Sequence, residues 1–100
     1  IDFNELHYGK DQKPHPAYIT AKHGHKYKAN SITHARTTND GRNTFKIYEN
    51  PNKLSKDKRI TRISPPFWQS EKQFGNEKLT NFRFSNETRK QIKKFNKKNR

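Results

Sequence analysis

The scarcity of aliphatic side chains is the feature that most limits what this chain can fold into. Its 100 residues include three Leu, seven Ile and four Ala, but no Val and no Met. Such a composition, combined with a formal net charge of +14, is typical of chains that stay disordered. Twelve aromatic side chains oppose that tendency, because each ring buries a large apolar area. We therefore expect residues 1–100 to form a single small domain with aromatic rings in its core and flexible ends.

The positive charge is concentrated in the second half of the chain. Residues 51–100 carry 15 Lys and Arg against four Asp and Glu, whereas residues 1–50 carry eight against five. The last stretch, Arg89 to Arg100, holds seven basic residues and no acidic one. Like charges four residues apart weaken an isolated helix by repulsion. A chain that keeps such a helix is therefore expected to lay it against an anionic partner.

Nucleic acid is the anionic partner that this composition favours. A membrane is disfavoured, because no apolar run approaches the roughly 20 residues of a spanning helix, and the terminal helix lacks the broad apolar face of an interfacial helix. The chain contains no cysteine, which excludes disulfides and thiolate metal sites. No cofactor is expected. Because no signal peptide is visible, the simplest expected location is the cytoplasm.

Alternating apolar and polar residues, separated by turn residues, predict five short strands. They are expected at residues 17–21, 26–33, 44–49, 59–64 and 79–84, with turns at His23-Gly24 and Asn39-Asp40-Gly41. In the second strand, even-numbered residues from Lys26 to Ile32 share one face and odd-numbered residues from Tyr27 to Thr33 share the other. The segment that holds Phe67-Trp68 and Phe74-Gly75 receives no assignment.

A basic helix is predicted at the C-terminal end. Ser85 is a good N-cap, and Glu87 suits the positive end of the helix dipole. The helix is expected to run from Asn86 to about Lys97 and to bury only Ile92 and Phe95. The fold class is therefore mainly β (α+β), a small curled sheet or barrel of about five strands with one C-terminal basic helix. A flexible lead-in over residues 1–13, a β body over 14–84 and a helix with its tail over 85–100 are expected.

Two motifs stand close together in the first half of the chain. His15-Pro16-Ala17-Tyr18-Ile19 opens the first expected strand, and Ser31-Ile32-Thr33-His34-Ala35-Arg36 ends the second. Over about residues 14–36 they resemble the MazF/PemK-like toxins and, more closely, the ToxN-type endoribonucleases. Here His15 stands where the MazF pattern has Arg, and His34 stands where both patterns favour Ser. The resemblance implies an SH3-like barrel, an antitoxin protein as a partner, and metal-independent cleavage of RNA.

The cleavage implied by this resemblance is an attack of a 2′-hydroxyl on the neighbouring phosphate. The protein must then move protons and stabilise developing negative charge. The candidate catalytic residues are Thr33, which could hydrogen-bond the phosphate, Arg36, which could clamp it, and His15 or His34, which could act as acid or base. In the alternative interpretation, Thr33 is an ordinary strand-end residue and the others are solvated surface residues.

Aromatic rings interleaved with basic side chains are typical of RNA-binding surfaces, where rings stack on unpaired bases and cations hold phosphates. Most rings are needed in the core, but Trp68 could serve either purpose. The predicted nucleic-acid-binding residues are Lys26, Lys28, Arg59, Arg62, Trp68, Arg89, Lys90, Lys93, Lys94, Lys97 and Lys98. In the alternative interpretation, these basic residues form a solvent-exposed surface without a binding role.

The His23-Gly24-His25 motif lacks further ligands at a suitable spacing, so we expect a polar turn and no metal site.

Two functions are consistent with these features. The first is a non-catalytic RNA- or DNA-binding module, with RNA favoured over DNA, such as an accessory factor of a mobile element or of a ribonucleoprotein. The second is a toxin-like endoribonuclease that an antitoxin keeps silent. Both predict steeply salt-dependent binding. They differ in geometry, because the enzyme needs Thr33, Arg36 and a histidine to converge on one phosphate position. The sequence leaves the oligomeric state open.

Overall fold

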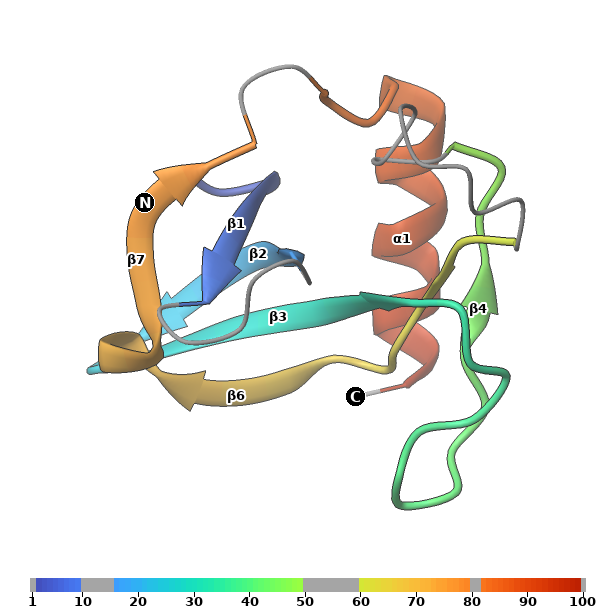
Figure 1. Cartoon of the computed structure of the whole chain (residues 1–100), viewed down its shortest axis with the longest axis horizontal. Helices are drawn as coiled ribbons and strands as arrows, with labels where there is room; N and C mark the ends of the chain where they lie inside the picture. Colours follow the sequence, from blue (N-terminus) through green and yellow to red (C-terminus); the bar gives the residue numbers. More distant parts are fainter. Residues whose placement is uncertain (1, 10–15, 50–59, 80–81, 100) are drawn as a thin grey trace.

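The structure, a computed structural model, describes residues 2–9, 16–49, 60–79 and 82–99, and these residues form seven antiparallel strands and one α-helix. In chain order the elements are β1 (Glu5–Gly9), β2 (Pro16–His23), β3 (Lys26–Thr33), β4 (Phe45–Lys46), β5 (Arg62–Ile63), β6 (Phe67–Ser70), the 3-10 helix η1 (Glu71–Gln73), β7 (Phe74–Lys78) and α1 (Asn86–Lys98). The predicted fold class, mainly β with one C-terminal basic helix, is confirmed (Figure 1).

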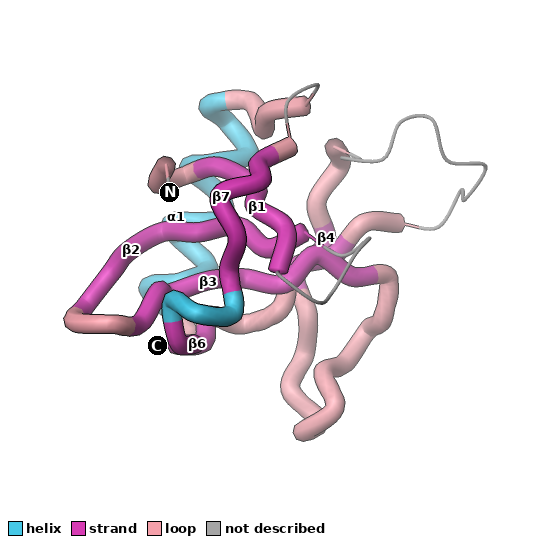
Figure 2. Tube along the Cα trace, turned by 60° about the vertical axis from the view of Figure 1, so that its left-hand side comes forward, coloured by secondary structure: helices cyan, strands magenta, loops and turns pink. Residues whose placement is uncertain are grey.

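Five of the strands form a curled antiparallel sheet in the order β7-β1-β2-β3-β6. The short helix η1 joins β6 at one end of this order to β7 at the other, so the sheet bends back on itself (Figures 1 and 2). The two-residue strand β5 pairs with the C-terminal end of β3, and β4 pairs with β5. The small curled sheet expected from the sequence is therefore present, with a two-stranded extension.

Three strands lie where the sequence predicted none. β6 and β7 fall in the unassigned segment, and β1 falls in the predicted lead-in. The prediction of a flexible lead-in over residues 1–13 is wrong at Glu5–Gly9, because β2 and β7 pair with this segment on its two sides. The strand predicted over 79–84 is also wrong in its described part. There the rings of Phe82 and Phe84 pack edge to face, and Phe84 is buried in the core instead of lying in a strand.

The strand β3 is buried on both faces of the sheet. Tyr27 and Ala29 lie inside the curl, where they pack with Phe74 and with residues of β2. Ile32 belongs to a second cluster that includes residues of α1, and Asn30 bonds to α1 directly. We call the face that α1 covers the outer face. The alternation predicted for this strand is confirmed, since even-numbered residues occupy the outer face.

The helix α1 begins as its sequence predicts. Ser85 caps it by accepting a hydrogen bond from the Thr88 backbone N–H at 3.2 Å. A stripe of residues four apart, Thr88, Ile92 and Asn96, is buried against the sheet, and Phe95 stacks on Phe45 with the ring centroids 5.1 Å apart. The prediction that the helix buries only Ile92 and Phe95 is therefore wrong, because a polar partner on β3 allows Asn96 to be buried.

A reciprocal pair of amides joins α1 to β3. The Asn30 Nδ2 donates to Asn96 Oδ1 at 2.8 Å, and the Asn96 Nδ2 donates to Asn30 Oδ1 at 3.0 Å. Asn30 is fully buried, and its Nδ2 also donates to the Ser64 carbonyl at 2.9 Å. These bonds fix the rotation of the helix about its axis, because both form only when Asn96 faces Asn30.

We expect Asn96→Ala to lower the free energy of unfolding by about 2 kcal/mol, because the Asn30 amide would stay buried with fewer hydrogen-bond partners. Urea denaturation followed by circular dichroism measures the change. Lys94→Ala, on the exposed side of the same helix, is the control, and it should change the free energy by less than about 0.5 kcal/mol. An unchanged urea midpoint for Asn96→Ala would show that the amide pair does not form in solution.

Candidate nucleic-acid interface

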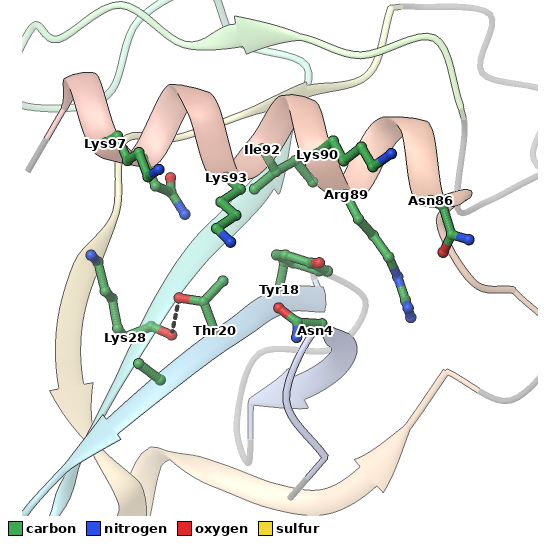
Figure 3. A pocket seen from close by; sticks show the side chains of 12 residues that line it. Asn4, Tyr18, Thr20, Lys28, Asn86, Arg89, Lys90, Ile92, Lys93 and Lys97 are labelled. Atoms are coloured by element: carbon green, nitrogen blue, oxygen red, sulfur yellow. Dashed lines mark hydrogen bonds between the residues drawn. The ribbon is translucent and has the colours of Figure 1, made fainter.

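A groove of about 620 Å³ lies between α1 and the outer face of the curled sheet. One wall comes from α1 and the other from β2 and β3 (Figure 3). The described residues that line it include no acidic side chain and five basic ones, namely Lys28, Arg89, Lys90, Lys93 and Lys97. We call this feature the basic groove. It brings together five of the residues that the sequence predicted to bind nucleic acid.

Helical periodicity places three of these lysines on one wall. Lys90, Lys93 and Lys97 are three and four residues apart, so they lie on the same side of α1. Figure 3 shows Lys93 extending from the helix toward the strands. A rise of 1.5 Å per residue spreads Lys90 to Lys97 over about 10 Å of the helix axis. Lys94 and Lys98, also predicted to bind, are exposed on α1 and do not line the groove.

A β-bulge shapes the opposite wall. The register of β2 against β3 shifts between Ile19 and Ala21, and the consecutive residues Thr20 and Ala21 both line the groove. The Thr20 hydroxyl donates to the Lys28 carbonyl at 3.3 Å, and the Lys28 side chain rises from β3 toward the helix (Figure 3). The short side chains at the bulge leave room for a ligand between Lys28 and α1.

The four groove lysines differ from Arg89 in their electrostatic surroundings. The Arg89 Nη2 lies 2.9 Å from Glu5 Oε1, and the Arg83 Nε lies 3.0 Å from the same oxygen. The side chains of Arg89 and Glu5 are only 18% and 14% exposed, so Arg89 is held in an ion pair within the fold. The four groove lysines are Lys28, Lys90, Lys93 and Lys97. Within the described part of the chain, no carboxylate pairs with any of them.

Two further predicted residues, Lys26 and Trp68, share the outer face with the groove. In the antiparallel register, Lys28 is opposite Trp68 and Lys26 is opposite Ser70. Directly opposite residues point to the same face of a sheet. Lys26 is exposed, and Trp68 is 49% exposed. Lys26 and Trp68 therefore lie beside the basic groove on the same face of the sheet, although neither of them lines it.

The remaining predicted binding residues do not contribute to the groove. The Arg62 guanidinium donates to the Thr44 hydroxyl at 2.7 Å and to the Thr44 carbonyl at 2.8 Å. It therefore stabilises the extension that β4 and β5 form beside β3. Arg59 lies outside the described residues, as does the candidate catalytic residue His15.

The other candidate catalytic residues lie at the C-terminal end of β3, and none of them lines the groove. The Thr33 hydroxyl accepts a hydrogen bond from the Ala35 N–H at 3.1 Å, and the His34 Nδ1 donates to the Ile60 carbonyl at 3.0 Å. Arg36 is exposed at the start of a loop that projects from the body of the protein (Figures 1 and 2). Their joint action in catalysis stays a prediction from the sequence.

The two histidines of the β2–β3 turn have different partners. Gly24 makes this turn with a φ of 60°, as glycine readily does. His25 Nδ1 lies 2.9 Å from Glu71 Oε1, and the hydrogen bonds from His25 and then Lys22 hold the pKa of Glu71 below its usual value. The His23 ring instead packs edge to face with Trp68, at 6.4 Å between centroids. In the described ranges, no three His, Asp or Glu side chains gather as metal ligands.

Sequence reasoning missed the neutral residues of the groove. Asn4 takes a left-handed φ of 61°, which Asn tolerates better than most residues, and it lies near Tyr18 in the groove. Thr20 and Ala21 are there because of the bulge. No local sequence signal marks that bulge, since it arises from the pairing of β2 with β3.

In the described residues, no helix has the length and apolar character needed to cross a membrane. The resemblance to MazF/PemK-like and ToxN-type proteins stays a prediction from residues 14–36. No protein-family model matches the chain, and no curated protein or solved structure matches it either.

Proposed function

We propose that this protein binds nucleic acid in the basic groove, with RNA preferred over DNA. The observation that carries the proposal is the convergence of Lys28 from β3 with Lys90, Lys93 and Lys97 from α1, with no acidic residue among the described lining. Ammonium groups that face one another across a groove repel each other, and a phosphate backbone relieves this repulsion while it releases its own counterions.

An extended polyanion suits this groove better than a single small anion. The lysines on α1 are spread over about 10 Å of the helix axis, so they can contact successive phosphates of one strand. Lysine side chains act as mobile point charges that position a backbone and carry no base readout. We therefore expect binding with little sequence preference from the groove itself. The preference for RNA rests on the resemblance of residues 14–36 to RNA-directed proteins.

Salt dependence of the affinity is the test of this proposal. If the four groove lysines each neutralise one phosphate, the slope of log K against log salt should be about −2.8 to −3.6, since each phosphate contributes about −0.7 to −0.9. Fluorescence anisotropy with a labelled RNA across a salt series measures the slope. A slope near zero, or no binding at low salt, would rule out the proposal.

The proposal covers binding and does not extend to cleavage. Thr33, His34 and Arg36 lie outside the groove, and the Thr33 hydroxyl and the His34 Nδ1 are bonded to backbone groups. An endoribonuclease activity and an antitoxin partner stay predictions from the resemblance, and a cytoplasmic location stays a prediction from the sequence. Gel analysis of RNA incubated with the protein in EDTA separates the two functions, because a pure binder returns the RNA intact.

A further inference from the structure

We infer that Trp68 forms a base-stacking subsite at the β6 side of the basic groove, so that the ligand is a strand with unpaired bases. The inference rests on the proposed function and specifies which form of nucleic acid the groove accepts. Trp68 is opposite Lys28 in the register of β3 and β6, and Lys28 lines the groove. The side chains of directly opposite residues in antiparallel strands lie about 5 Å apart at Cβ. The indole is therefore next to a groove cation.

Trp68 is one of four large apolar side chains that stay exposed in the described residues, with Phe3, Tyr48 and Ile60. Apolar side chains are scarce, and the preceding residue, Phe67, packs inside the curl. Because side chains alternate along a strand, Trp68 points to the outer face, where it is 49% exposed. This chain has few apolar side chains for its core, yet its largest aromatic ring lies at the surface. The burial of this ring would otherwise stabilise the fold.

The Trp68 ring also has an aromatic neighbour on the same face. His23 lies opposite Lys26 at the end of the β2–β3 hairpin, and its ring packs nearly perpendicular to the indole, with an interplanar angle of 78°. An edge-to-face neighbour restricts the rotation of an aromatic side chain. A ring that is fixed before binding loses less conformational entropy when a ligand stacks on it.

This arrangement suits unpaired bases and not a duplex. In a duplex the bases are stacked on each other, so a ring on a sheet surface meets only the backbone and the groove edges. In a single strand each base can turn toward an aromatic ring while its phosphate lies in a positive groove. Trp68 can stack on the base of one nucleotide while the adjacent Lys28 contacts the phosphate of the same nucleotide. Lys93 and Lys97, on the opposite wall, are then available for the neighbouring phosphates.

The fluorescence of the protein provides a direct test, because Trp68 is the only tryptophan of the chain. Three probes of equal length separate the contributions: a single-stranded RNA, an abasic strand with the same phosphates, and a blunt RNA duplex. We expect the single-stranded RNA to quench the Trp68 emission. The abasic strand should bind with a similar salt slope but without quenching.

The variant Trp68→Leu keeps an apolar side chain and removes the stacking ring. Its affinity for single-stranded RNA should fall about tenfold, whereas its affinity for the abasic strand should change less than about twofold. Tyr48→Leu is the matched control, since Tyr48 is 83% exposed, packs under Lys46 and does not line the groove. It should bind all three probes as the unchanged protein does.

The outcomes distinguish the inference from the proposed function. If Trp68→Leu binds single-stranded RNA as tightly as the unchanged protein, the stacking subsite is wrong and the groove proposal stands. If the unchanged protein binds none of the probes at low salt, both are wrong. Equal quenching by duplex and single strand would also overturn the inference. If Trp68→Leu does not fold, the stacking subsite is tested by the quenching of the unchanged protein with the three probes.

Discussion

The double variant Lys93→Glu/Lys97→Glu is expected to bind RNA about 100-fold more weakly than the unchanged protein at low salt, because it removes two phosphate contacts and places two carboxylates in the groove. The control is Lys94→Glu/Lys98→Glu, which makes the same change of net charge on the same helix. Lys94 and Lys98 are exposed outside the groove. The control should weaken binding by only a few-fold, through the long-range field of the protein.

Comparison of the two double variants shows whether RNA binds in the basic groove or is attracted by the net charge of the protein. Both change two lysines four residues apart, so the effects on helix stability are similar. Anisotropy titrations with one labelled RNA give the two affinities, and the slope of log K against log salt should become less steep by about 1.5 in the groove variant alone. Equal losses in the two variants would mean that binding follows net charge and that the groove is not the site.

The parts of the fold that depend on neighbouring residues could be predicted from the sequence. The β2–β3 hairpin follows from its alternation and from the turn at Gly24, and α1 follows from the cap at Ser85 and its basic composition. The strand β1 could not be predicted, because the strand β7 that pairs with it and the partner of Glu5 lie far away along the chain. Glu5 pairs with Arg89, 84 residues away along the chain.

In the candidate site, too, some features could be predicted from the sequence and others depend on distant residues. The spacing of the lysines on α1 predicts charged stripes, and Lys28 and Lys93 were both expected to bind. Which stripe faces the sheet depends on the bond between Asn96 and Asn30, residues 66 positions apart, so it could not be read from the helix alone. The ion pair between Arg89 and Glu5 could not be predicted for the same reason.

The variant Ile92→Ala is expected to lower the free energy of unfolding by about 3 kcal/mol, because it leaves a cavity in the hydrophobic cluster between α1 and the outer face of the sheet. Ile92 is fully buried in the cluster that contains Tyr18 and Phe84. The chain has few aliphatic side chains that could move into the space. The melting temperature should fall by roughly 10–20 °C, as measured by circular dichroism.

The loss of stability in Ile92→Ala also tests whether α1 is a wall of the RNA site. A ligand that binds only the folded state at about 100 times its Kd adds about 2.7 kcal/mol to stability, so RNA should restore most of the lost melting temperature. The control Lys93→Glu/Lys97→Glu keeps Ile92 in the core but lacks two groove cations, so the same RNA concentration should raise its melting temperature far less. If RNA stabilised both variants equally, it would be binding elsewhere, and α1 would serve the fold without forming the site.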